Sequence, residues 1–418
     1  MKPMITRRLS FLVYFVLLAS TPLVAQSTIA KFLLSAHHDT KVNAINEQLL
    51  YLDDKPYRLS PLQRLEVRTQ SNQLDPARQG YAVRINPANP WEIRNNNQYF
   101  QEYRSLLELK RDLALEEALL DRYALMIDWL YQQELKTIKE KGSNLVDAYL
   151  AVLEKQQYSN FFDGEDYVKL KLEQIDRSVE LEEVIFEADD LLLQIKNLYP
   201  AADNPAAWSD QHIISVDRLL LIADSVWQGH TPPTTLAYYD GRINLAQREY
   251  SLEKSNISVG FLQAQYQEFR IDQGRKPWNL SMGVTIPIVN PNKGDMTKRK
   301  MDVIEKQQEK QEAAAELGSA SIRFREQLKS QVTRYYGVQT KINELKASPL
   351  SSTLNTMKEN NPTVQIRLTG NVLKLETIAL KLKQSILHTY VAFLGTMDVL
   401  QKRPLVNYLS ERLEIIER

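Results

Sequence analysis

The most regular alternation of apolar and polar side chains in this chain lies in residues 277–294, PWNLSMGVTIPIVNPNKG. Apolar side chains occupy every second position, and small or polar side chains lie between them. The apolar set is Trp278, Leu280, Met282, Val284 and Ile286. Successive side chains of a strand point to opposite faces, so this pattern predicts a strand with one apolar and one polar face. The Asn- and Pro-rich end of the segment predicts a turn.

Three other segments have strand patterns. Residues 64–72 and 80–87 alternate in the same way and are separated by Asp75-Pro76 and Gly80, which predicts a hairpin. Residues 256–271 form a third candidate, which would pair with the strand beginning at Trp278. Its apolar positions change phase near Phe261, which predicts a β-bulge there.

Long helices follow each strand pair. Helical periodicity covers residues 98–158, 165–198, 210–228, 234–254, 295–346 and about 372–400. About 50 residues at a rise of about 1.5 Å give a helix roughly 75 Å long. The predicted seam of the second helix consists of Leu172, Ile175, Val179, Phe186 and Leu193. Such narrow apolar seams favour antiparallel pairing of helices in a coiled-coil manner.

The two halves of the chain repeat each other weakly. Val83 and Asn89-Pro90 recur as Val284 and Asn290-Pro291, and Lys171-Leu172-Glu173 recurs as Lys374-Leu375-Glu376. The two matches have nearly the same offset, which indicates duplication of a unit made of a strand pair and a helical hairpin. We therefore predict a first repeat over residues 27–233 and a second over 234–418, intertwined as one structural unit.

The first 26 residues have the pattern of a secretory signal peptide. Lys2, Arg7 and Arg8 precede a short apolar stretch over residues 9–19, and small residues follow around Ala25. The alternative is a membrane anchor, but the apolar stretch is shorter than the roughly 20 residues that span a bilayer, and Pro22 interrupts it.

Composition narrows the classes of function. The chain has 52 basic and 52 acidic residues, which does not indicate a nucleic-acid-binding protein, and it has no cysteine. Neither a nucleophile motif nor a phosphate loop nor a metalloprotease motif is found, and the adjacent His37 and His38 would point in different directions on a helix. We therefore predict that the protein is not an enzyme and has no catalytic residues, cofactor or metal site.

The predicted strands cannot close a barrel within one chain. About eight strands are the practical minimum for a membrane barrel, and open strand edges are not tolerated in lipid. Four strands per chain therefore predict that several copies share one barrel. The apolar residues Trp278, Leu280, Met282, Val284 and Ile286 would then face lipid.

At this point the chain resembles the TolC-type outer-membrane efflux proteins. The resemblance rests on the strand and basic helix start WNLSMGVTIPIVNPNKGDMTKRK, on the helix in residues 233–261 and on the final helix in residues 368–395. It implies a mainly α fold with a small β-barrel part. Long antiparallel coiled-coil helices would form a periplasmic tunnel, and four strands per chain would contribute to a shared trimeric barrel in outer-membrane lipid of a Gram-negative-type envelope.

The same resemblance implies the partners and the function. It implies a homotrimer that docks onto a periplasmic adaptor protein and an inner-membrane pump. The channel would pass substrates from the periplasm or the pump to the exterior. No lipid-attachment cysteine lies near the signal, so a non-lipidated subgroup is expected.

Acidic residues near the two predicted helical turns are the candidate site. The turns are expected near Gly164 and Gly370, and by the resemblance they form the periplasmic mouth. The candidate acids are Asp163, Glu165, Asp166 and Glu376. Repeated around a threefold axis, they would form a ring that favours cations. The alternative is that they are solvated turn residues, or helix N-terminal acids favoured by the helix dipole.

Two other functional classes are left open. One is a periplasmic coiled-coil adaptor or structural protein without a pore, which would lack barrel strands. The other is a secreted enzyme, for which no motif is present.

Overall fold

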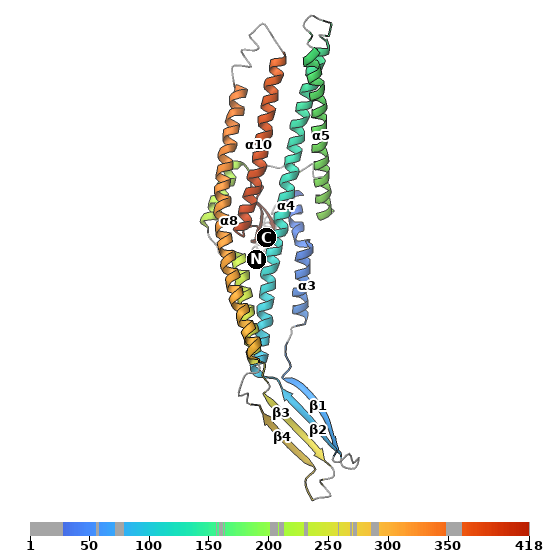
Figure 1. The fold of residues 1–418 in the computed structure, drawn as a ribbon, viewed down its shortest axis with the longest axis vertical. Helices are drawn as coiled ribbons and strands as arrows, with labels where there is room; N and C mark the ends of the chain where they lie inside the picture. Colours follow the sequence, from blue (N-terminus) through green and yellow to red (C-terminus); the bar gives the residue numbers. More distant parts are fainter. Residues whose placement is uncertain are drawn as a thin grey trace, which may run out of the picture. The chain divides into compact units, whose positions relative to one another are not determined.

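The computed structural model describes residues 28–55, 58–71, 79–155, 157–158, 162, 164–200, 208, 213–229, 233–257, 259–267, 270, 274–285, 292–347 and 362–417. The predicted signal peptide lies outside the described residues. The helices are α2 (Thr28–Leu34), α3 (Thr40–Asp54), α4 (Pro90–Lys155), α5 (Gly164–Leu198), α6 (Val216–Gln228), α7 (Thr234–Ser255), α8 (Lys293–Ala347) and α10 (Pro362–Thr396), with the 3-10 turn η1 (Ser35–His38). The strands are β1 (Leu62–Ser71), β2 (Gln79–Pro87), β3 (Gly260–Gln267), β4 (Trp278–Val284), β5 (Leu405–Asn407) and β6 (Glu414–Glu417) (Figure 1).

The contacts within the chain divide it into two compact units, and α4 runs through both. One unit comprises residues 1–35, 128–215 and 403–418, and the other comprises residues 36–127 and 216–402. In the part of the chain that the structure describes, no helix has both the length and the apolar character needed to cross a membrane.

The first unit pairs the second part of α4 with α5. Polar contacts join the two helices along their length: Gln132 donates to Glu187, Lys139 pairs with Glu180 at 2.7 Å, and Gln174 donates to Asp147 at 2.6 Å. Its apolar core contains Phe32 of α2 and Trp208, whose ring centroids lie 5.2 Å apart, and Ile195 of α5. The short strands β5 and β6 pair antiparallel in this unit.

The second unit contains the four-stranded sheet and the helices α3, α6, α7, α8 and α10, together with the first part of α4 (Figure 1). Ion pairs join α7 to α8, among them Arg242 to Glu309 and Arg299 to Glu249, at 2.6 and 2.7 Å. The buried side chains of Leu328, Val332 and Ile342 form the apolar seam of α8, and Gln331 donates to Ser385 of α10.

The sheet has the order β1-β2-β3-β4, with every neighbour antiparallel. The predicted first hairpin is confirmed, with bounds shifted by one or two residues, and the predicted strand at Trp278 is also confirmed. The order strand, strand, helix, helix occurs twice along the chain, as β1-β2-α4-α5 and as β3-β4-α8-α10. That order agrees with the predicted duplication, whose boundary at residue 233 stays a prediction.

The predicted bulge at Phe261 is wrong. The pairing of β3 with β2 and β4 runs without a register shift. The apolar positions change phase instead at Gly260, where β3 begins and the backbone φ is 136°. A Cβ at Gly260 would lie 2.0 Å from the carbonyl oxygen of Gly283, so only glycine fits this close approach of two backbones.

The predicted seam of α5 is also wrong in its role. Its five residues, Leu172, Ile175, Val179, Phe186 and Leu193, are all exposed. The side chains that α5 buries within its own unit are Leu170, Val184, Ala188 and Ile195. The heptad spacing identifies an apolar stripe correctly, but within one chain that stripe is left uncovered.

Candidate functional site: a sheet with two unlike faces

One face of the sheet between β1 and β4 is built from apolar and neutral side chains. In antiparallel pairs, directly opposed residues share a face, so the register assigns each side chain. This face carries Leu65, Val67 and Thr69 from β1, Tyr81, Val83 and Ile85 from β2, Leu262, Ala264 and Tyr266 from β3, and Trp278, Leu280, Met282 and Val284 from β4. The face therefore carries no charged side chain over these rows.

This apolar face is uncovered. Val67 is 74% exposed and Met282 is 76% exposed, and Trp278, Leu280 and Val284 are similarly exposed. An exposed apolar patch of this extent is typical of a surface that contacts another protein or a membrane. The described part of the predicted lipid-facing strand, from Trp278 to Val284, lies on this face, and Ile286 lies outside the described residues.

An aromatic row closes one end of the apolar face. Tyr81 opposes Tyr266, and Tyr266 opposes Trp278, so the three rings lie in one row across β2, β3 and β4. The ring centroids of Tyr266 and Trp278 are 4.8 Å apart. Tyr and Trp are enriched where a membrane meets water because their rings have both an apolar body and a polar group.

The opposite face of the sheet is polar. It carries Arg64, Glu66 and Arg68 from β1, Ala82, Arg84 and Asn86 from β2, Phe261, Gln263 and Gln265 from β3, and Asn279, Ser281 and Gly283 from β4. Side-chain amides predominate on β3 and β4. The sheet thus separates an apolar side from a hydrophilic side, as the wall of a water-filled barrel does.

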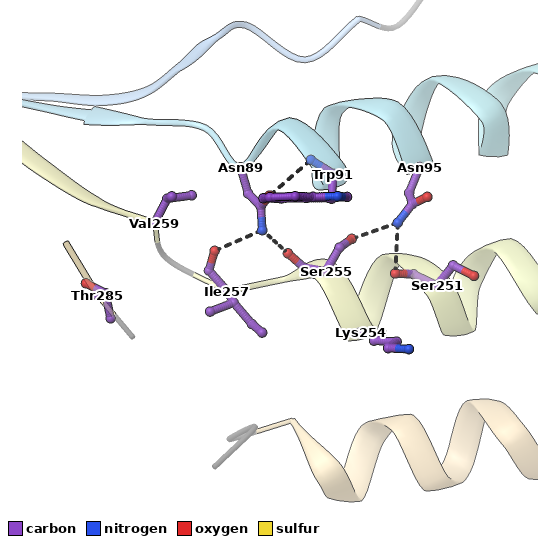
Figure 2. Close-up of a pocket in the computed structure, with 9 residues that line it drawn as sticks. All are labelled: Asn89, Trp91, Asn95, Ser251, Lys254, Ser255, Ile257, Val259 and Thr285. Atoms are coloured by element: carbon purple, nitrogen blue, oxygen red, sulfur yellow. Dashed lines mark hydrogen bonds between the residues drawn. The ribbon is translucent and has the colours of Figure 1, made fainter. Parts of the chain in front are cut away.

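Two asparagines join the start of α4 to the end of α7, beside the sheet. Asn89 lies between β2 and α4, and its Nδ2 donates to the carbonyl oxygens of Ser255 at 2.7 Å and Ile257 at 3.3 Å (Figure 2). The Oδ1 of the same side chain accepts from the backbone N–H of Trp91, which caps α4. Asn95, one turn along α4, donates to the carbonyl oxygen of Ser251 and to the hydroxyl of Ser255. Ser251 and Ser255 belong to α7 and Ile257 follows it, so the two asparagines join the start of α4 to the C-terminal end of α7.

A pocket lies beside this junction. Besides the two asparagines, Trp91, Lys254, Val259 and Thr285 line it (Figure 2). The polar groups of Asn89 and Asn95 are engaged in the junction hydrogen bonds described above. We therefore interpret the pocket as part of the structural junction and do not assign it a ligand.

A buried carboxyl pair lies among the helices of the second unit. Burial, with a hydrogen bond to Asp398, raises the pKa of Glu116 to about 10. The Oε1 atom of Glu116 is buried without a hydrogen-bond partner. The sequence alone does not indicate this pair, because the burial of Glu116 depends on contacts with residues far away in the chain. The only local signal is an acid among the apolar residues Leu115, Ala118 and Leu119.

The predicted mouth acids are distributed over two helices. Glu165 and Asp166 lie in the first turn of α5, and Glu165 pairs with Lys169 at 2.6 Å. Glu376 lies in α10 and pairs with Lys346 of α8 at 2.7 Å. Asp163 lies outside the described residues. The ring of acids stays a prediction.

The two predicted turn glycines differ in outcome. Gly164 is the first residue of α5, close to the predicted turn. Gly370 lies inside α10, which begins at Pro362, so the turn predicted there is wrong. Glycine weakens a helix by only about 1 kcal/mol relative to alanine, so one glycine does not end a long helix that is supported by packing.

Among the described residues, no group of three or more His, Asp or Glu side chains is arranged to hold a metal ion.

Comparison with known proteins identifies the fold. No family model matches the chain, and no curated protein matches its sequence. The chain has the fold of solved outer membrane channels, which agrees with the resemblance. The chain is similar to the CmeC outer membrane channel of Campylobacter jejuni, with a TM-score of 0.62 and 11% identity over 89% of this chain and 84% of that one.

Two further solved structures agree. The outer membrane protein VceC of Vibrio cholerae gives a TM-score of 0.63 and 8% identity, covering 88% of this chain and 96% of that one. The open state of the MtrE outer membrane channel of Neisseria gonorrhoeae gives 0.63 and 10% identity, covering 90% of each. The likeness extends over nearly the whole described chain.

Proposed function

We propose that this protein is the outer-membrane channel of a tripartite efflux or export system, and that it is not an enzyme. Three copies would share one barrel in outer-membrane lipid, and their long helices would extend into the periplasm. A periplasmic adaptor and an inner-membrane pump would deliver substrates to the lumen. The observation that carries this proposal is the sheet, whose apolar face suits lipid and whose polar face suits a water-filled lumen.

The edges of the sheet support a shared barrel. β1 and β4 lie at the edges of the four-stranded sheet, and each has a neighbour on one side only. Unpaired backbone groups are not tolerated in hydrocarbon, so these edges require strands from other copies. Three sheets of four strands supply twelve strands, which lies within the range of known membrane barrels.

The exposed stripe on α5 supports association through the helices as well. Leu172, Val179, Phe186 and Leu193 recur every seven residues, and Ile175 lies beside them at coiled-coil spacing. A helix that leaves such a stripe uncovered within its own chain has a surface for a helix of a neighbouring copy. Contact with a neighbouring copy would account for the exposure of these five residues.

The alternative of a periplasmic adaptor without a pore is disfavoured by the same sheet. An adaptor has no need of an uncharged, exposed face bordered by a row of aromatic rings. The neighbours of known structure named above are described as outer membrane channels or proteins. Their identity to this chain is low, so we take the fold from them and the function from the sheet.

The proposal is tested by fractionation and by conductance. We expect the protein in the outer-membrane fraction, as a trimer by native mass measurement in mild detergent, and with a conducting pore in planar bilayers. Leu280→Arg should prevent assembly, whereas Ser281→Arg on the polar face should assemble. A folded, water-soluble protein that fails to insert into bilayers would contradict the proposal and would favour the adaptor.

A further inference from the structure

We propose that the polar face of the sheet is an anion-attracting section of the lumen, formed by Arg64, Arg68 and Arg84, and that it favours the passage of anionic solutes. This inference rests on the proposed channel function, because it requires the polar face to line a lumen. It adds a charge preference of the pore that neither the fold nor the comparisons specify.

The charged residues of this face are gathered in one place. The register sets Arg84 of β2 directly opposite Glu66 of β1, and Arg64 and Arg68 lie two residues to either side of Glu66 on the same face. Among the described residues of the polar face, Glu66 is the only acid, against three arginines. Each chain therefore contributes an excess of two positive charges, three minus one, to a wall that otherwise carries neutral side chains.

The single carboxylate is covered by its neighbours. Glu66 pairs with Arg64 at 3.2 Å and accepts from the Nε of Arg68 at 2.7 Å. The side chain of Glu66 is 17% exposed, whereas that of Arg64 is 70% exposed and that of Arg68 is 48% exposed. A solute in the lumen would therefore meet guanidinium groups rather than the carboxylate.

Arg84 is held in place by uncharged groups. Its Nε donates to the Oε1 of Gln263 at 2.9 Å, and its guanidinium lies 4.1 Å from the ring centroid of Phe261. Phe261 itself lies across Gly283, where an added Cβ would approach the ring to 2.4 Å. An arginine fixed by an amide and an aromatic ring keeps its full charge and retains N–H groups for a bound anion.

Repetition in a trimer would strengthen the effect. Three copies would bring six excess positive charges around one lumen. A ring of cationic side chains in a narrow, low-dielectric passage raises the local concentration of anions and selects for them. Solutes that carry carboxylate, sulfonate or phosphate groups would all respond to this field, because each carries a negative charge.

The first experiment measures binding of an anionic probe without requiring an open pore. Purified trimer in detergent is titrated with pyrenetetrasulfonate at low salt, and fluorescence anisotropy reports binding. We compare the wild type with R64Q/R68Q/R84Q, with the charge-retaining R64K/R68K/R84K, and with K110Q/K141Q/K381Q. The last variant removes three exposed lysines from α4 and α10 instead.

We expect R64Q/R68Q/R84Q to bind the probe at least tenfold more weakly than the wild type. The control K110Q/K141Q/K381Q should retain the wild-type affinity. The Arg-to-Lys variant should keep most of the affinity, because charge rather than arginine geometry attracts the probe. Equal binding by the wild type and the Arg-to-Gln variant, with both shown to be intact trimers, would overturn the inference.

The second experiment separates this inference from the channel function. In planar bilayers with a potassium chloride gradient, removal of the three arginines should lower the chloride-to-potassium permeability ratio, and the helix-lysine control should not. A pore whose ratio is unchanged by the Arg-to-Gln substitutions would refute the anion preference while leaving the channel intact. Absence of any conductance from intact trimers would count against the channel function, and the probe titration would still decide the charge of the face.

Discussion

The carboxylate of Asp398 accepts hydrogen bonds from both the backbone N–H and the hydroxyl of Thr235, at 2.9 and 3.2 Å. Thr235 lies in the first turn of α7, where an anion is favoured by unpaired N–H groups and by the helix dipole. Asp398 follows α10 and has a φ of 49°, so the left-handed turn after α10 directs its carboxylate to α7. The side chain of Asp398 also shares a hydrogen bond with Glu116 of α4. The helices α4, α7 and α10 therefore meet at this one buried carboxylate.

The first prediction concerns the pH dependence of stability. The pKa of Glu116 is raised from its usual value to about 10 in the folded protein, so Glu116 is protonated at neutral pH. The stabilisation that this proton provides is complete below the unfolded pKa of about 4.5 and is lost as the pH rises toward 10. We expect the wild type to lose thermal stability between pH 6 and 9, at up to about 1.4 kcal/mol per pH unit from this group.

Glu116→Gln should flatten this dependence, because the amide keeps a donor toward Asp398 and cannot ionise. Helix melting followed by circular dichroism at several pH values measures the slope. The control is Glu117→Gln, which removes an exposed acid that pairs with Lys41. An unchanged slope in Glu116→Gln would show that the pair does not govern the pH response.

The second prediction concerns the two faces of β4. Leu280 lies on the apolar face, and Ser281, its neighbour in the chain, lies on the polar face. An arginine near the midplane of a membrane barrel costs about 2–4 kcal/mol on the lipid side. We expect Leu280→Arg to abolish the trimer, as seen by native mass measurement in mild detergent, and Ser281→Arg to retain it. Similar behaviour of the two variants would contradict the assignment of faces.

The third prediction concerns Gly260. Its φ of 136° is unfavourable for any residue with a side chain, and a Cβ there would clash with the backbone of Gly283. We expect Gly260→Ala to destabilise the sheet by about 1–3 kcal/mol and to reduce assembly. Gly294→Ala is the matched control, because a Cβ at Gly294 meets no atom within 4 Å. Comparable yields of assembled protein from both variants would show that the backbone at Gly260 is not constrained.

The fourth prediction concerns the stripe on α5. Phe186 is 76% exposed in the single chain, and we propose that a neighbouring copy covers it. Phe186→Glu should therefore lower the fraction of trimer without unfolding α5, because the change places a charge in an apolar contact. Ser178→Glu, an exposed position outside the stripe, is the control. Native mass measurement over a dilution series decides whether the trimer is weakened.

The sequence predicted those elements whose signals are local. The alternation around Trp278 and Leu280 is contained in one strand. The register of the sheet places the apolar side chains of this strand and its neighbour on the same face. The start of α4 at Pro90 was missed by eight residues, although Asn89 followed by proline is a recognisable helix start.

Features that depend on distant contacts could not be predicted. The heptads of α5 indicate an apolar stripe but do not say whether the partner helix belongs to the same chain. The pKa of Glu116 is raised first by its burial and then by its contact with Asp398, which is almost three hundred residues away in the chain. The arginine cluster required knowledge that β1 and β2 place Glu66 opposite Arg84, which alternation alone does not give.

The last prediction concerns the acids at the α4–α5 turn. Glu165 and Asp166 lie in the first turn of α5, where the helix dipole stabilises them whether or not they line a pore. If they contribute to a narrow mouth, replacing Asp163, Glu165 and Asp166 by their amides should raise the chloride-to-potassium permeability ratio or alter the resting conductance. A fixed charge acts strongly in a constriction and weakly beyond about 8 Å at physiological salt.

The control for these acids must remove equivalent charge without disturbing the fold. Glu116 is unsuitable, because it is buried and bonded to Asp398. Glu312 and Glu316 on α8 are exposed, and together with Glu140 on α4 they provide three acids for substitution by glutamine. Purified trimers of both variants are compared in planar bilayers for ion selectivity and conductance. If the turn variant and the control variant cannot be distinguished in either measurement, Glu165 and Asp166 serve the start of α5, and the constriction of the pore lies elsewhere.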